Sequence, residues 1–330
     1  MIQIVLEAPG QLAERNARMP EAAPGEALVR MEKIGVCGSD FHAFAGKHPI
    51  YTYPRVLGHE LSGVILAVPE NDKGIRAGDR CAIEPYISCG ECRACRRGRN
   101  NCCEKIQLLG IHVDGGMQEF LPVPIRLLHK SDSLTLDQLA LVETLGVGAH
   151  AVERSGLKAG DEALVVGAGP IGIAVAQFAL VQGADVHVVE RNEWRCRFAE
   201  QMGFAASLSA EGRRGDVVFD ATGNAEAMSA SLELVATGGS LVYVGLTRDP
   251  IRIDDSLFHR REITLLASRN SCNQFPAIIR QIENGRIDTS PWITHRLSLT
   301  DVVAQFQDLP EQQTLIKAMI DVRNGHELDE

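Results

Sequence analysis

The second half of the chain alternates short apolar runs with amphipathic segments that end before a glycine. Runs rich in Val, Ile and Leu predict strands, and the segments between them have the length and the C-terminal glycines typical of helices. This alternation predicts an α/β fold, a parallel sheet with helices on both faces. The predicted strands span residues 163–166, 186–190, 216–220, 240–245 and 262–268, and the predicted helices span 171–182, 193–202 and 225–235.

The first 142 residues have a different pattern. Short β-branched or apolar runs, such as 27–31 and 61–68, are separated by Gly and Pro. This pattern predicts a strand-rich and loop-rich domain. The tail, residues 276–322, mixes helical and strand patterns, and we expect it to pack back onto the first domain. A length of 330 residues agrees with two or three domains.

Composition excludes several classes of protein. The chain is 45% hydrophobic and 23% charged, close to the average for globular proteins. Its 33 Lys and Arg against 43 Asp and Glu give a net charge of −10, which repels nucleic acid and anionic membranes. The first ten residues lack the basic start and apolar stretch of a secretory signal, so we expect a cytoplasmic protein. The apolar run 163–181 is interrupted by Gly and Pro, which favours strand, turn and helix over a membrane span.

A glycine-rich motif lies between a predicted strand and a predicted helix. Residues 165–172 read VVGAGPIG and contain G-x-G-x-x-G in the context that a dinucleotide site requires. Gly167 allows the tight turn, Gly169 lets the backbone approach a pyrophosphate, and Gly172 permits close packing of the helix on the strand. Pro170 suits the first helical turn. The helix N-terminus would then face the phosphates.

The residues after the next predicted strand bear on the choice of coenzyme. Glu190 stands 18 residues after Gly172, near the position where an acidic side chain accepts hydrogen bonds from the adenosine ribose. This favours NAD. Arg191 is the counter-signal, because an Arg there can bind the 2′-phosphate of NADP.

Six of the nine cysteines fall within 23 residues. In a reducing compartment such crowding indicates metal binding. The spacing of Cys89, Cys92, Cys95 and Cys103 predicts a closed structural zinc site. An iron–sulfur run would continue with three residues, Cys and Pro, which this chain does not do. Cys102 is the alternative to Cys103 as the fourth ligand.

Two further segments carry candidate metal ligands. They are Cys37-Gly-Ser-Asp40 and Gly58-His-Glu60. Cys37 and His59 are 22 residues apart, a separation that no local ligand rule fixes. From spacing alone, buried structural roles for both residues stay open.

Together these motifs resemble the zinc-containing medium-chain dehydrogenases. The resemblance rests on the two segments above, the four-cysteine lobe, Glu143 in Val-Glu-Thr-Leu and VVGAGPIG, in the order of the family. Glu143 stands where alcohol dehydrogenases proper have Cys, as on the sorbitol and threonine dehydrogenase side. The stretches YPRVLGHE, GRNNCCEK, HVDGG, FHRRE and SRN are similar to the bacterial L-galactonate 5-dehydrogenase group.

The resemblance implies a fold for each part of the chain. Residues 1–146 would form a GroES-like β-barrel catalytic domain with a structural zinc lobe at 81–105. Residues 147–270 would form a Rossmann NAD-binding domain with a doubly wound parallel sheet, and residues 271–330 would return to the catalytic domain. The active site would lie in the cleft between the domains.

The same resemblance implies roles for individual residues. Cys37, His59 and either Glu143 or Glu60 would hold a catalytic zinc, and Ser39, His42 and Glu60 would act in catalysis. Ser39 as a helix cap and His42 as a surface residue are the plain alternatives. The implied coenzyme contacts are the glycine-rich loop with Ile171, then Glu190, Arg191, Arg195, Thr222, Val244, Gly245, Leu246, Ser268, Arg269 and Asn270.

The implied activity is the NAD-dependent oxidation of a secondary alcohol in a sugar acid or polyol. A zinc ion with an open position lowers the pKa of the hydroxyl, hydride passes to NAD, and Ser39 passes the proton through the nicotinamide ribose to His42. Polyol or L-threonine dehydrogenation, a zinc-free enone reductase and a non-catalytic zinc or redox sensor are the alternatives. We expect a homodimer or homotetramer with two zinc ions per chain.

Overall fold

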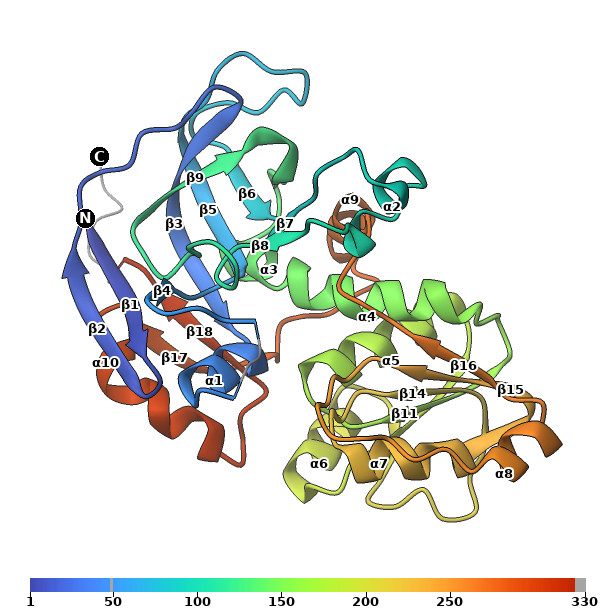
Figure 1. The fold of residues 1–330 in the computed structure, drawn as a ribbon. Coiled ribbons are helices and arrows are strands. Elements are labelled where there is room, and N and C mark those ends of the chain that lie inside the picture. The colour runs from blue at the N-terminus through green and yellow to red at the C-terminus, as the bar shows by residue number, and fades with distance from the viewer. Residues whose placement is uncertain (48–49, 324–330) are drawn as a thin grey trace. The chain divides into compact units, whose positions relative to one another are not determined.

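The computed structural model describes residues 1–47 and 50–323, which form two compact units. The first unit contains residues 1–143 together with the segment from Phe275 onward. The second unit is continuous and spans Thr144–Gln274. Figure 1 shows the strands and helices of each unit. Among the described residues, no helix has both the length and the apolar character needed to span a bilayer.

The first unit is built mainly of antiparallel strands. Its largest sheet has seven strands, in the order β10-β6-β5-β3-β18-β17, with β9 paired to β3. Alternating buried positions along β3 give the sheet one face toward the core. The strands of this unit are β1 (Ile2–Ala8), β2 (Gln11–Asn16), β3 (Glu26–Val36), β4 (Arg55–Val56), β5 (Glu60–Ala67), β6 (Arg80–Ile83), β7 (Tyr86–Ile87), β8 (Gln107–Leu108), β9 (Phe120–Pro124), β10 (Leu128–Lys130), β17 (Ile293–Ser298) and β18 (Lys317–Asp321).

The C-terminal segment completes this sheet. β18 pairs with β3 in antiparallel fashion, with Ala318 opposite Val36, and β17 runs parallel to β18. Phe275, Trp292 and Phe306 are fully buried side chains of this segment. The helices of the unit are short: α1 (Gly38–Phe44), α2 (Arg93–Arg96), η1 (Asn100–Cys102), η2 (Ile125–Leu127), α3 (Leu136–Ala140), α9 (Phe275–Glu283), α10 (Val302–Gln305) and η4 (Phe306–Glu311).

The second unit contains a six-stranded parallel sheet in the order β13-β12-β11-β14-β15-β16. The order reverses between β11 and β14, which is the doubly wound Rossmann arrangement. Because parallel crossovers are right-handed, helices that follow β11 and β12 lie on one face and those that follow β14 and β15 on the other. The strands are β11 (Glu162–Val166), β12 (Asp185–Val189), β13 (Ala205–Ser207), β14 (Gly215–Asp220), β15 (Val235–Tyr243) and β16 (Thr264–Ala267).

The helices of this unit agree with the sequence patterns in two cases and differ in a third. The apolar run at 163–181 forms β11, a turn and α5 (Pro170–Gln182), and α6 (Glu193–Gln201) follows β12. The helix expected over 225–235 is wrong in its extent: α7 (Ala225–Ala230) gives way to the 3₁₀ helix η3 (Ser231–Leu234), and β15 begins at Val235. The remaining helices are α4 (Val142–Ser155), whose first two residues belong to the first unit, and α8 (Asp255–Arg260).

One crossover has no helix. β13 ends at Ser207 and β14 begins at Gly215, so residues 208–214 alone make the connection between these strands. Connections between parallel strands usually need a dozen residues or more. The short loop leaves a cavity of about 520 Å³ beside the starts of β11 and β12.

Candidate active site

Cys37 is fixed at the junction of β3 and α1. It follows the last residue of β3 and is the N-cap of α1. Its backbone N–H donates to Asp40 Oδ2 at 2.9 Å, and its carbonyl accepts from the N–H of Asp40 at 3.0 Å. Asp40 is completely buried. The turn therefore holds the Cys37 thiol in one place.

Strand register brings His59 and Glu60 to Cys37. β3 and β5 are antiparallel, and Gly35 lies opposite Glu60. Cys37, two residues beyond Gly35, thus lies near His59, one residue before Glu60. The possible ligand atoms of Cys37, His59 and Glu60 all lie within 4.8 Å of one another.

Two side chains of α1 flank the imidazole of His59. Its Nδ1 is 3.6 Å from Asp40 Oδ1, and its Nε2 is 3.5 Å from Ser39 Oγ. Nδ1 and Asp40 Oδ1 are buried and face each other just beyond hydrogen-bonding distance. A carboxylate behind one ring nitrogen orients a metal-binding histidine. This arrangement leaves Nε2 as the nitrogen that is available to a metal.

The surroundings of His59 favour positive charge. Burial lowers the pKa of His59, but the negative charges of Asp40 and Cys37 outweigh burial, so that the pKa is well above its ordinary value. Burial raises the pKa of Asp40, against the opposing effect of His59. The buried surroundings of His59 therefore favour positive charge, which suits the binding of a divalent cation.

The two candidate glutamates have different partners. Glu143 is the second residue of α4 and accepts a hydrogen bond from the Tyr86 hydroxyl. Glu60 is paired with Lys317, whose Nζ is 2.6 Å from both carboxylate oxygens. Of the two, the described structure places Glu60 in the group with Cys37 and His59.

Ser39 and His42 lie on α1. Ser39 is close to His59, as described above, and Cys37 rather than Ser39 is the N-cap. His42 is exposed in the last turn of the helix. Since residues three apart share a helix face, Ser39 and His42 are neighbours on α1.

The residues present fit a zinc ion. One thiol, one imidazole and one carboxylate are the ligands typical of catalytic zinc, where three protein ligands leave a position open. The unpaired Asp40 Oδ1 and His59 Nδ1 become oriented partners when Nε2 binds a metal.

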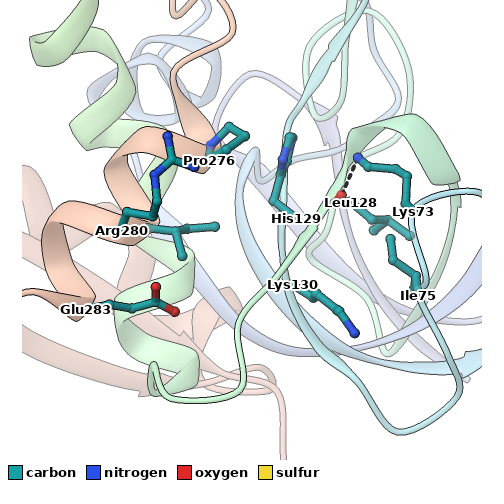
Figure 2. Close-up of a pocket in the computed structure, with 9 residues that line it drawn as sticks. Lys73, Ile75, Leu128, His129, Lys130, Pro276, Arg280 and Glu283 are labelled. Carbon is teal, nitrogen blue, oxygen red and sulfur yellow. Dashed lines mark hydrogen bonds between the residues drawn. The ribbon is translucent and has the colours of Figure 1, made fainter.

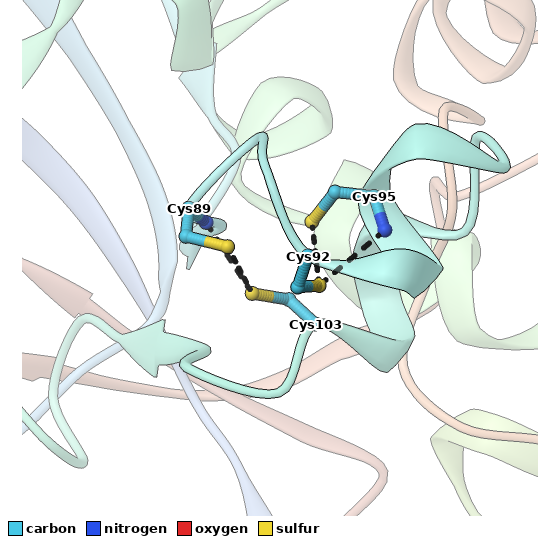
Figure 3. Close-up of side chains that lie close together, drawn as sticks. All are labelled: Cys89, Cys92, Cys95 and Cys103. Atoms are coloured by element: carbon cyan, nitrogen blue, oxygen red, sulfur yellow. Dashed lines mark hydrogen bonds between the residues drawn. The ribbon is translucent and has the colours of Figure 1, made fainter.

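A second group of ligands lies in the lobe around α2 (Figure 3). Cys89, Cys92, Cys95 and Cys103 form it, so Cys103 and not Cys102 completes the set. The Sγ atoms of Cys92 and Cys95 are 3.5 Å apart, and those of Cys89 and Cys103 are 3.4 Å apart. Four thiolates at 2.3 Å from zinc would be about 3.8 Å apart in a tetrahedron. The lobe therefore has nearly the dimensions of a closed zinc site.

Backbone N–H groups already stabilise negative sulfur in this lobe. The N–H of Cys95 points to Cys92 Sγ at 3.5 Å, and such contacts lower the pKa of Cys92 to about 6. The N–H groups of Cys89 and Lys105 point to Cys103 Sγ at 3.3 and 3.4 Å. Thiolates, not thiols, bind metal.

In the second unit, the glycine-rich loop joins β11 to α5. Gly167 has φ +99°, and a Cβ at Gly172 would overlap the carbonyl oxygen of Gly167. A Cβ at Gly169 would meet no described protein atom within 4 Å. Gly169 is the N-cap of α5 without a side-chain cap, and Pro170 is in the first turn. The N–H groups of the first helical turn, at Ile171 and Gly172, have no partner within the helix and can bind an anion.

Glu190 is anchored beside this loop. Its Oε2 accepts from the N–H of Ala168, and its Oε1 accepts from the N–H of Asn192, both at 2.8 Å. It lines a cavity of about 320 Å³. Other predicted coenzyme residues that line the cavity are Gly167, Gly169, Arg191, Arg195 and Thr222.

The remaining predicted coenzyme residues follow the last two strands of the sheet. Val244, Gly245 and Leu246 come after β15, and Ser268, Arg269 and Asn270 come after β16. They lie outside the described lining of the cavity, but at the same carboxyl edge of the sheet, where ligands of doubly wound folds bind.

Sequence reasoning assigned no role to Asp40, Tyr86 or Lys317. Asp40 belongs to the Cys37-Gly-Ser-Asp40 segment, which the sequence indicates as a source of metal ligands, so a role for Asp40 near the metal could have been predicted. Lys317 sits in an apolar strand, Ile316-Lys-Ala-Met-Ile320, and a lone charge in such a run indicates a buried partner. Tyr86 carries no sequence signal.

A third cavity lies within the first unit, between β10 and α9 (Figure 2). Its volume is about 270 Å³, and Lys73, His129, Lys130, Arg280 and Glu283 line it. Lys73 Nζ donates to the carbonyls of Arg126 and Leu128 at 2.9 and 2.6 Å, and Glu283 accepts from Ser131. These polar groups bond mainly within the fold, so we assign no ligand to this cavity.

Family models match both units. A model described as an alcohol dehydrogenase GroES-like domain matches residues 23–133, and one described as a zinc-binding dehydrogenase matches residues 170–284. L-galactonate-5-dehydrogenase of Escherichia coli K12 is 36% identical over 332 residues, which cover 96% of this chain and 98% of that protein.

Solved structures are similar over nearly the whole chain. A zinc-binding dehydrogenase of Sinorhizobium meliloti 1021, bound to NADP, has a TM-score of 0.90 and 29% identity over 97% of this chain and 98% of its own. RspB of Escherichia coli CFT073, described as a short chain alcohol dehydrogenase and complexed with NADH, has a TM-score of 0.91 and 29% identity over 97% of this chain and 99% of its own.

Proposed function

The chain belongs to the zinc-containing medium-chain dehydrogenase family, and on this basis we propose that it oxidises a secondary alcohol of a sugar acid, of the L-galactonate class, with NAD as acceptor. The observation that carries the proposal is the buried group of Cys37, His59 and Glu60. A sensor or a zinc-free reductase has no need of such an open three-ligand set.

Each residue at this site has a separate task. When bound, zinc supplies a Lewis acid that lowers the pKa of an alcohol hydroxyl, and NAD supplies the acceptor for hydride. Cys37, His59 and Glu60 hold the metal, and Asp40 orients His59 through Nδ1. Glu143, which accepts from the Tyr86 hydroxyl, interacts electrostatically with His59 and Glu60.

Ser39 and His42 carry the proton. Ser39 Oγ, next to His59 Nε2, accepts the proton from the substrate hydroxyl and gives up its own hydroxyl proton toward His42. His42 lies one helical turn further along α1 and is exposed, so it delivers the proton to water.

The lobe of Cys89, Cys92, Cys95 and Cys103 binds a second, structural zinc in this proposal. Two zinc ions per chain follow. Glu190 accepts hydrogen bonds from the adenosine ribose and makes NAD the preferred coenzyme, while Arg191 and Arg195 lie at the same cavity.

We further propose that the enzyme works in the cytoplasm as a homodimer or homotetramer. β16 is the edge strand of the Rossmann sheet, and its Leu265 is 37% exposed. An unpaired edge with an apolar side chain favours pairing with another chain.

A substrate screen tests the function. Reduction of NAD is followed at 340 nm with aldonates that include L-galactonate, with polyols and with L-threonine, and each reaction is repeated with NADP. We expect the highest kcat/KM with L-galactonate or a related acid and with NAD. Cys37→Ser, which removes one ligand of the proposed catalytic zinc, should lower kcat by at least about a hundredfold.

Two outcomes would contradict the proposal. Activity confined to polyols or to L-threonine would contradict a sugar acid as the substrate, while the protein would still be a dehydrogenase. Equal activity of the wild type and Cys37→Ser would mean that the proposed catalytic metal site takes no part in the reaction.

A further inference from the structure

Lys317 is a buried lysine at the first position of β18. Only 2% of its side chain is exposed, and 1% of that of Glu60. Its Nζ is 2.6 Å from both Glu60 oxygens and 3.3 Å from the carbonyl oxygen of Val36. Burial of an ammonium group is costly unless it is paired and hydrogen-bonded. These contacts meet that condition.

Glu60 is confined on its other side by the backbone. It lies opposite Gly35 across β3 and β5, and a Cβ at Gly35 would overlap Glu60 Oε2. β18 lies on the opposite edge of β3 from β5, with Ala318 opposite Val36. Glu60 therefore has its carboxylate over Gly35 and its two oxygens turned to Lys317.

The charge of Lys317 acts on the whole group of acids at the site. Asp40, Glu60 and Glu143 are 0%, 1% and 6% exposed, so water screens them little. Lys317 is paired with Glu60 and also interacts electrostatically with Asp40 and Glu143. It partly neutralises the charge that attracts a metal ion.

We propose that Lys317 is a positioning residue that holds the Glu60 carboxylate and thereby limits how tightly the Cys37, His59 and Glu60 site retains its metal. The inference rests on the proposed function, in which these three residues bind zinc. Since like charges repel, an ammonium group on a ligand carboxylate weakens the bond of that carboxylate to a cation. The ammonium group thereby keeps the metal exchangeable.

The test is metal release. The full chain, loaded with zinc, is mixed with the chelating dye 4-(2-pyridylazo)resorcinol, and the released zinc is followed by absorbance. The Cys37→Ser variant lacks one ligand of this site. The kinetic phase of zinc release that is present in the wild type and absent from this variant is therefore assigned to the site. In Lys317→Met, which removes the charge and keeps the length of the side chain, we expect this phase to slow by about tenfold or more. Lys317→Arg should release zinc nearly as fast as the wild type.

A double-mutant cycle shows whether Lys317 acts through Glu60. Glu60→Gln removes the charge that Lys317 holds, and in this background Lys317→Met should change the release rate less than twofold. The double variant has no lone buried charge, so it remains informative if Lys317→Met alone folds poorly.

Several results would overturn the inference. The first is release of zinc from Lys317→Met at the wild-type rate. The second is that Lys317→Met slows release as much in the Glu60→Gln background as in the wild type. The third is that Lys317→Met lowers the Tm and leaves the release rate unchanged. Failure of the proposed function looks different: Cys37→Ser would then release the same amount of zinc as the wild type, in the same phases.

Discussion

Gly169 and Gly172 belong to one motif but are glycines for different reasons. A Cβ at Gly172 would overlap the backbone of Gly167, whereas a Cβ at Gly169 would enter open space beside the N-terminus of α5. The protein itself therefore requires glycine at 172. At position 169 the fold does not require glycine. A glycine there is explained by a ligand that approaches the backbone closely.

This difference gives a matched pair of variants. Gly172→Ala should lower the free energy of unfolding by about 1–3 kcal/mol, because the added methyl group forces the loop and the helix apart. Gly169→Ala should keep the wild-type stability and weaken NADH binding by at least about tenfold. Urea denaturation and NADH fluorescence titration measure the two effects. Equal NADH affinity of Gly169→Ala and the wild type would contradict a pyrophosphate site here.

His187 gives a prediction on pH. Burial and, secondarily, Arg213 lower its pKa below the ordinary 6.5, and its Nε2 is bonded to Ser207 Oγ at 2.8 Å. Below pH 6.5 the unfolded chain binds a proton that the folded chain does not. This site therefore stabilises the fold above pH 6.5, and the contribution is lost as the pH falls toward the pKa of the folded state.

The comparison is made between the wild type and His187→Gln. Urea unfolding midpoints are measured at pH 7.5 and at pH 5.5. From the higher to the lower pH, the midpoint of the wild type should fall further than that of the variant. If the two proteins lose stability in parallel, His187 is not the source of this dependence.

At the scale of elements, the cysteine lobe is the feature that depends most on a metal. It consists of α2, η1 and connecting loops, and it has few apolar side chains to stabilise it. Zinc binding supplies folding free energy in such segments. Cys102 lies in the same lobe, outside the four-cysteine group.

Cys92→Ser and Cys102→Ser therefore should behave differently. Cys92→Ser should lose one zinc per chain and unfold at a lower temperature, while Cys102→Ser should retain both properties of the wild type. Inductively coupled plasma mass spectrometry and calorimetry provide the measurements. Loss of zinc from Cys102→Ser would mean that the fourth ligand is wrongly assigned.

The sequence patterns were sufficient for elements whose signals are local. The strands and helices on either side of the glycine-rich loop lie where hydrophobic runs and terminal glycines predict them. The helix over 225–235 was predicted too long because its apolar pattern continues into η3 and β15. Periodicity does not show where a helix tightens into a 3₁₀ turn. The strand β13, only three residues long, was missed as well.

The candidate site depends on pairing between distant strands, which local patterns do not encode. Cys37 and His59 meet because Gly35 pairs with Glu60, and Lys317 joins them through the pairing of β18 with β3. The family resemblance supplied Cys37, His59 and two candidate glutamates. The choice of Glu60 for the three-ligand group, and its pairing with Lys317, required the three-dimensional register.

At the scale of the whole molecule, the two kinds of site belong to different units. Both candidate metal sites use residues of the first unit, and the cavity beside the glycine-rich loop uses residues of the second. The second unit has its own core, in which Val218, Val235 and Leu241 are completely buried. A unit with its own core keeps its structure when a ligand of the other unit is removed.

Metal removal should therefore separate oxidation from coenzyme binding. After dialysis against EDTA and 1,10-phenanthroline, we expect loss of oxidation and NADH binding within about threefold of the wild-type affinity. The unfolding temperature of the first unit should fall by about 10 °C or more, because the lobe loses its stabilising ion. Activity assays, NADH fluorescence and calorimetry on one metal-free preparation measure all three. Gly169→Ala is the opposite control, since it should keep its zinc and bind NADH at least about tenfold more weakly. If NADH binding disappeared together with the metal, the coenzyme site would depend on the first unit, and the assignment of binding to the second unit alone would be wrong.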